Sequence, residues 1–96
     1  MRIPKKIKLG SRIFKVEISD KFVKDHNIYG QAHFGKQKIL IDNNPDYPMQ
    51  NQEITFLHEW LHMALTQVGE DELSENESFV DKLSEKLHEL ITQLEK

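Results

Sequence analysis

The sequence predicts an α+β fold in which a small antiparallel sheet of two hairpins packs on two antiparallel helices. The first half of the chain alternates apolar and polar residues, which is typical of half-buried strands. The second half carries apolar residues at spacings of three and four, which indicates helices. We therefore expect one domain over residues 1–96, mainly β in residues 1–48 and mainly α in residues 49–96.

The first hairpin is predicted from the alternation between Ile7 and Ile18. A two-residue turn at Gly10-Ser11 would place Leu9 opposite Arg12 and keep the apolar side chains on one face of the sheet. The polar stretch that follows, Ser19–Asn27, could form a single helical turn.

The second hairpin is predicted over Tyr29–Phe34 and Gln37–Asp42, around a turn at Gly35-Lys36. The segment from Asp42 to Pro48 is rich in Asn, Asp and Pro, so it should close the β part of the chain as a loop.

Two helices should follow this loop. We expect the first to run from about Met49 or Asn51 to Val68, with Gly69 as the residue that ends it. We expect Ser74 to cap the second helix, with Glu77 in the capping-box position. The apolar positions of this second helix include Val80, Leu83, Leu87 and Leu94.

The amino-acid composition argues against several classes of protein. The 96 residues include no cysteine, so disulfides and cysteine-bound zinc are excluded. A formal charge of −3 and a pI near 5.9 argue against a nucleic-acid-binding surface. One basic cluster alternates with apolar residues and so indicates the solvated face of a hairpin: Arg2, Lys5, Lys6, Lys8, Arg12 and Lys15. With neither an apolar leader segment nor a membrane-spanning run, we expect a soluble cytoplasmic protein that does not bind membranes.

The motif His58-Glu59-Trp60-Leu61-His62 predicts a metal site on the first helix. Histidines at positions i and i+4 lie on the same helix face, so both imidazoles can bind one ion. Glu59 lies about 100° around the helix from His58, where it can act on a water without being a ligand. The alternative is a pair of histidines at the edge of the core beside an unrelated glutamate.

A catalytic zinc needs a third protein ligand, and the second helix offers Glu77, Asp81 and His88 along one flank. If the two helices run antiparallel, Glu77 can lean back toward His62, and His88 lies beyond the metal. Asp81 is then placed to accept a proton from the outer nitrogen of a ligand histidine. The alternatives are a capping role for Glu77 and a solvated helix surface for Asp81.

The pattern from His58 to His62 followed by Glu77-Ser-Phe-Val-Asp81 resembles the HExxH…ExxxD scheme of gluzincin metallopeptidases. The small, cysteine-free chain most resembles the minimal ImmA/IrrE-type metallopeptidases that phages and other mobile elements often carry. The resemblance implies a zincin-like core with His58, His62 and Glu77 as zinc ligands, Glu59 as general base, and Asp81 orienting a ligand histidine. This chain departs from the larger relatives in ending about twenty residues after Glu77, which leaves efficient proteolysis by the chain alone open.

The resemblance implies hydrolysis of a peptide bond in a protein or peptide substrate, such as a repressor or another regulatory protein. Such enzymes add the substrate as a strand to a sheet edge, for which the hairpin at residues 29–34 is the candidate. His33, His26 or Tyr29 could stabilise the oxyanion, although a plain strand role is open for each. A partner subunit could complete the cleft of so small a chain.

Three other classes stay open on the sequence. The same ligands could stabilise a protein-interaction module that is catalytically weak or inactive. A nucleic-acid hydrolase would usually add a third histidine soon after the motif, and none lies between Met63 and Leu87. In a helical binding protein without zinc, Glu59 and both histidines would have no common function.

Overall fold

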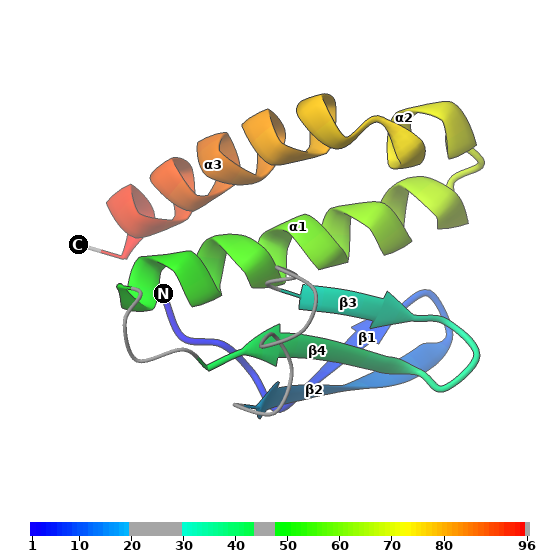
Figure 1. Cartoon of the computed structure of the whole chain (residues 1–96), viewed down its shortest axis with the longest axis horizontal. Coiled ribbons are helices and arrows are strands. Elements are labelled where there is room, and N and C mark those ends of the chain that lie inside the picture. Colours follow the sequence, from blue (N-terminus) through cyan, green and yellow to red (C-terminus); the bar gives the residue numbers. More distant parts are fainter. Residues whose placement is uncertain (20–29, 44–47, 96) are drawn as a thin grey trace.

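The computed structural model describes residues 1–19, 30–43 and 48–95 of the chain. They form an α+β structure in which a four-stranded sheet packs on one side of the first long helix and the second long helix lies on its other side (Figure 1). The predicted helical turn in residues 19–27 falls almost wholly outside the described residues. None of the helices in the described part is both long enough and apolar enough to cross a membrane.

The four strands are β1 (Lys6–Leu9), β2 (Arg12–Ser19), β3 (Gly30–His33) and β4 (Lys38–Asp42). Both predicted hairpins pair antiparallel: Leu9 lies opposite Arg12 in the first, as expected, and β3 pairs with β4 in the second.

The prediction of a wholly antiparallel sheet was wrong. The strand order is β1-β2-β4-β3, and the two hairpins join through a parallel pair of β2 and β4. These two strands carry four buried apolar side chains of the sheet, Phe14, Val16, Ile39 and Ile41. Because β2 and β4 are the central strands, each is flanked by a paired strand on both sides. Alternation along a strand is the same for either pairing direction, so the sequence pattern could not predict this.

The helices are α1 (Met49–Gln67), α2 (Asp71–Glu75) and α3 (Glu77–Leu94). The first ends as predicted, with Gly69 in the left-handed conformation at a φ of +84°.

The predicted cap of the second long helix was wrong, because Ser74 belongs to the separate short helix α2. Asn76 caps α3 instead: its side-chain oxygen accepts a hydrogen bond from the Phe79 amide at 3.1 Å. Glu77 is therefore the first residue of α3 rather than a capping-box partner of Ser74.

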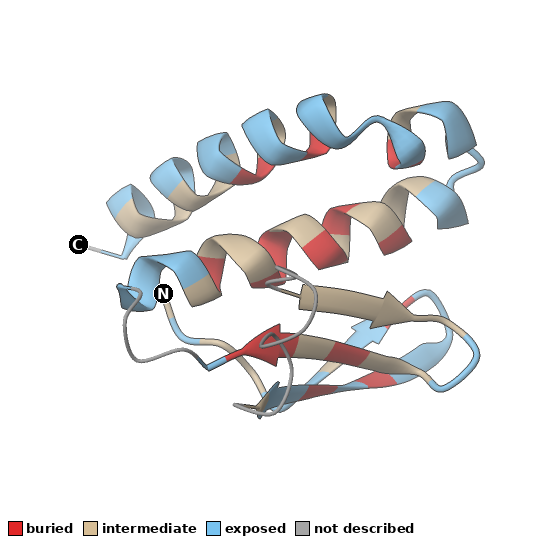
Figure 2. Ribbon diagram, viewed as in Figure 1, coloured by how far each residue is buried: buried red, intermediate tan, exposed pale blue. Residues whose placement is uncertain are grey.

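The core lies between α1 and the two elements that cover it. Buried residues concentrate on α1 and on the sides of α3 and the sheet that face it (Figure 2). The fully buried apolar side chains are Phe14, Ile39, Ile41, Met63 and Val80. Ile18 continues the inner face of β2 but is 45% exposed at the end of the strand. With one side on the sheet and the other against α3, α1 is the element from which a site between the layers can be built.

Candidate metal centre

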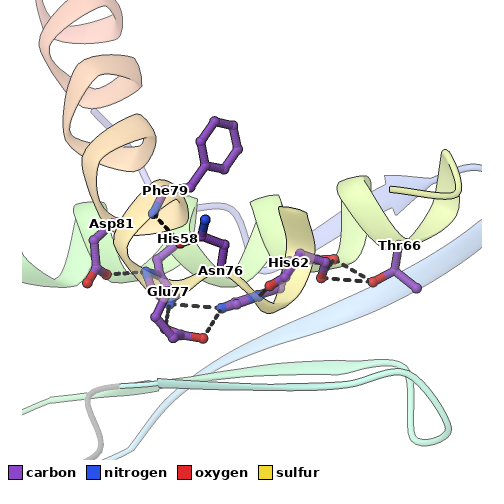
Figure 3. Close-up of polar contacts among 8 residues, drawn as sticks. His58, His62, Thr66, Asn76, Glu77, Phe79 and Asp81 are labelled. Carbon is purple, nitrogen blue, oxygen red and sulfur yellow. Dashed lines mark hydrogen bonds and ion pairs between the residues drawn. The ribbon is translucent and has the colours of Figure 1, made fainter. Parts of the chain in front are cut away.

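Two histidines of α1 and the first residue of α3 bring their polar atoms to one point (Figure 3). The Nε2 atoms of His58 and His62 lie 3.0 Å apart. One carboxylate oxygen of Glu77 lies 3.1 Å from His58 Nε2, and the other lies 3.0 Å from His62 Nε2. The antiparallel packing of α3 on α1 thus brings the predicted third ligand to both histidines.

The outer nitrogen of each histidine also has a partner. His58 Nδ1 lies 2.8 Å from a carboxylate oxygen of Asp81, the residue predicted for this position. His62 Nδ1 donates to the backbone carbonyl of Ser74, a partner that sequence reasoning missed. A backbone carbonyl has no side-chain signature, so only the placement of α2 could reveal it. Such outer partners fix the orientation of metal-binding imidazoles.

Short-range structure explains how these groups are positioned. Because Asn76 starts α3, Glu77 and Asp81 are one turn apart on the same face of the helix. The buried Ser74 hydroxyl donates to the backbone carbonyl of His62 at 2.9 Å and lies 3.0 Å from the Thr66 hydroxyl oxygen. These hydrogen bonds hold α2 against α1, and with it the carbonyl that orients His62.

The hydrogen-bond partners of the two histidines determine their tautomers. A carbonyl can only accept, so His62 must carry its proton on Nδ1, and the Asp81 carboxylate sets the same tautomer in His58. Neutral imidazoles then direct both Nε2 lone pairs toward each other and toward the Glu77 carboxylate. Such a group of acceptors needs a shared cation or added protons.

The arrangement fits a zinc ion. Zinc accepts imidazole nitrogen and carboxylate oxygen at about 2.0–2.2 Å in tetrahedral sites. Ligand atoms at these distances in a tetrahedral site are about 3.3–3.6 Å apart. The 3.0–3.1 Å separations among His58, His62 and Glu77 would need to widen by only a few tenths of an ångström to hold the ion. The histidine side chains are 17% and 20% exposed and that of Glu77 is 65% exposed, so the ligand atoms border an open cleft.

Glu59 lies beside this cluster but is not part of it. It is only 7% exposed, because β3 covers it from the sheet side. Burial raises its pKa to about 7, with smaller contributions from the negative charges of Glu77 and Asp81. A carboxyl group with a pKa near neutrality can take up and release a proton at physiological pH, as general acid–base catalysis requires.

The cleft beside the cluster has a volume of about 370 Å³ and lies between α1, α3 and the start of β3. Its lining residues are Gly30, Ile54, Thr55, His58, Glu59, His62, Glu77 and Asp81. On the sheet side it borders β3, which is an edge strand of the described sheet, as predicted for the hairpin at residues 29–34. An extended chain could add to that edge beside the cluster.

His33, the one predicted oxyanion donor among the described residues, does not lie in this cleft. His33 lies opposite Lys38 and contacts Gln31, two residues away on the same side of β3, whereas Gly30 and Ala32 turn toward α1. Its side chain is therefore on the face of the sheet that turns away from α1. His26 and Tyr29 lie outside the described residues.

His88 lies beyond the cluster, at the level expected from the antiparallel helices. Its Nε2 atom is 2.7 Å from a carboxylate oxygen of Glu53, and both side chains are nearly buried. It is therefore part of the packing between α1 and α3.

No protein-family model, curated protein sequence or solved structure matches this chain. The assignment of a function therefore depends on the geometry and chemistry described above.

Proposed function

We propose that this protein is a zinc-dependent metallopeptidase in which His58, His62 and Glu77 hold the ion. The observation that carries the proposal is the convergence of two imidazole Nε2 atoms and one carboxylate. The Nδ1 atom of each imidazole is paired with a hydrogen-bond acceptor, which orients the ring. Three protein ligands with one position left for water is the pattern of catalytic rather than structural zinc. The gluzincin scheme and the ImmA/IrrE-type resemblance, with its zincin-like core, are part of the same proposal.

When bound, zinc would supply Lewis acidity and lower the pKa of a coordinated water to about 7. Glu59 would accept the proton of the attacking water and return it to the leaving amine of the cleaved bond. Its buried carboxyl reaches the cleft from the same helix as the two histidines, so its position is set by the backbone of α1. Asp81 and the Ser74 carbonyl would keep both imidazoles in the required tautomer.

The substrate would be an extended peptide segment lying along β3, whose outer edge is unpaired within the described sheet. We retain a regulatory protein as the proposed substrate and the cytoplasm as the proposed location.

A second candidate is a zinc-stabilised interaction module with little or no hydrolytic activity. The observation that favours it is the position of His33, the one predicted oxyanion donor that the structure describes, on the far face of the sheet. Removing a donor of this kind costs an enzyme about a hundredfold or more in rate.

Zinc content and peptide hydrolysis, measured on the same variants, test the proposal. Wild type should bind one zinc per chain, and His62→Ala and Glu77→Ala should bind much less. Glu59→Gln should retain zinc while any hydrolysis of an unstructured protein substrate is lost. His33→Ala is the matched control, since it removes a histidine remote from the cleft and should change neither property.

The outcomes separate the candidates. Zinc binding without hydrolysis in wild type would favour the interaction module. Equal, negligible zinc in wild type and His62→Ala would overturn both.

A further inference from the structure

The register of the sheet places one basic residue from each strand in a single row. Lys6 lies opposite Lys15, Lys15 lies beside Lys38, and Lys38 lies opposite His33. Residues at matched positions of neighbouring strands project from the same face. With strands about 4.8 Å apart, the row is about 14 Å long.

This row lies on the face of the sheet that turns away from the helices. Its neighbours along β2 and β4, such as Phe14, Val16 and Ile39, are the residues buried toward α1. Because side chains alternate along a strand, Lys15 and Lys38 point to the opposite side. Lys8 is two residues from Lys6 in β1 and extends the basic surface on the same face.

The charges of the row are poorly compensated. Lys6 and Lys15 are exposed and have no ion-pair partner in the described part of the chain. Lys38 is 3.5 Å from Glu17, the one exposed acid of the described strands. Like charges directly opposite each other destabilise a sheet, so an anion bound across the row would remove a repulsion.

The chain is acidic overall, but its charges are unevenly distributed: the sheet is basic and the helices are acidic. Residues 1–19 and 30–43, which contain the sheet, have eight lysines and arginines and two acidic residues. Residues 48–95, which contain the helices, have two lysines and eleven acidic residues. The low pI is therefore an average over a basic part and an acidic part of the chain. It does not exclude an anionic partner at the sheet.

We propose that the open face of the sheet, defined by Lys6, Lys8, Lys15 and Lys38, binds the phosphate backbone of double-stranded nucleic acid. Protein interfaces are poor in lysine and rich in Tyr, Trp and Phe, whereas this face is lysine-rich and has no Phe, Tyr or Trp side chain in its described strands. Lysine binds phosphate as a point charge.

The lack of Phe, Tyr and Trp on this face of the described strands also indicates the kind of nucleic acid. Single strands are held mainly by bases stacked on several aromatic rings, and His33 is the one aromatic side chain that the described strands place on this face. Binding to a duplex through phosphates is independent of sequence and strongly dependent on salt. The acidic helical layer would face away from the duplex.

Fluorescence anisotropy of the full chain with labelled 20-base-pair duplexes, one of DNA and one of RNA, tests the proposal. The two duplexes share the phosphodiester chemistry, and their relative affinities show which is preferred. With about four phosphate contacts, the logarithm of the association constant should fall with a slope of about −4 against the logarithm of salt concentration. Lys15→Glu/Lys38→Glu should weaken binding at least tenfold at 50 mM salt, and Glu17→Gln should strengthen it.

Lys82→Glu/Lys86→Glu on α3 is the matched control, because it makes the same change in net charge on the helical layer. It should alter affinity less than twofold. Equal loss in both double variants would overturn the proposal, as would no binding by wild type to either duplex at 50 mM salt. A salt-sensitive dimer in sedimentation, without duplex binding, would instead assign the basic face to a second copy of the chain and would also overturn it.

Discussion

Glu59 has unusual surroundings for a glutamate. It is a carboxyl group within a packed helix, 7% exposed, with two further carboxylates close enough to raise its pKa. Ionising it in the metal-free chain sets a charge in a poorly hydrated position next to Glu77 and Asp81. A cation held by His58, His62 and Glu77 would reduce this repulsion, so the position of Glu59 is consistent with a site that functions with metal.

The first prediction concerns the pH dependence of stability without metal. Folding raises the pKa of Glu59 from 4.5 to about 7, so between these pH values the folded chain holds a proton that the unfolded chain has released. The stability from the neutral carboxyl is fully present below about pH 4.5 and is lost as the pH rises through 7. Glu59→Gln should therefore be more stable than wild type at pH 8, by on the order of 1–3 kcal/mol, and about equal to it near pH 4.5.

Urea unfolding in the presence of a chelator, from pH 4.5 to 8, measures this difference. Groups remote from Glu59 titrate in parallel in the two proteins, so their contributions cancel in the comparison. A constant difference across the range would show that Glu59 does not titrate with a raised pKa.

At the level of elements, the cleft depends on how closely β3 approaches α1. Gly30 makes this approach possible: a methyl group at its Cα would lie 2.5 Å from the Thr55 side chain, 3.1 Å from the Leu40 carbonyl oxygen and 3.2 Å from the Glu59 side chain. The second contribution comes from Asn76, whose cap sets where α3 begins and thereby places Glu77 over the histidines.

The second prediction is that Gly30→Ala forces β3 away from α1. The overpacking should lower the free energy of unfolding by about 1–3 kcal/mol and weaken zinc binding, because Glu59 and the helix that carries the histidines must shift. Denaturant unfolding and zinc titration measure the two effects.

Gly35→Ala provides the control, since a methyl group there meets nothing within 4 Å. Its effect on stability should stay within about 0.5 kcal/mol. Equal stabilities for the two variants would contradict the close contact between β3 and α1.

For the whole molecule, the packing of α3 on α1 is the junction that metal would strengthen. Among the described residues of α3, only Val80 and Ser84 are buried, whereas Leu90 and Leu94 are 52% and 74% exposed. Leu87 and Ile91 pack against the core only partly buried. An apolar contact with one fully buried side chain gives limited stability in a chain without disulfides. An ion bound by two residues of α1 and one of α3 would join these helices directly.

The third prediction is a large loss of thermal stability on removal of zinc. Metal that binds only the folded chain adds about 4 kcal/mol at a thousandfold excess over its Kd. For a domain of this size, that corresponds to a fall of ten degrees or more in Tm on chelation. Differential scanning fluorimetry with and without a chelator measures the change, and Glu77→Ala should respond much less. An unchanged Tm in wild type shown to have lost its zinc would mean that packing alone holds the helices together.

Features that depend on neighbours along the chain could be predicted from the amino-acid sequence. The turn at residues 10–11, the end of α1 at Gly69 and the shared face of His58 and His62 follow from local conformation and helical period. The approach of Glu77 and Asp81 to the histidines could also be predicted, because a short connection forces two helices to run antiparallel.

Features that join distant segments of the chain could not be predicted in this way. Alternation along a strand is the same for parallel and antiparallel partners, so the pairing of β2 with β4, and the row of lysines that it creates, had no local signal. The Ser74 carbonyl that orients His62 is a backbone group, which every residue possesses. The side of the sheet on which His33 lies depends on the register of β3 against β4, and this register is set by the packing of Gly30 and Ala32 toward α1.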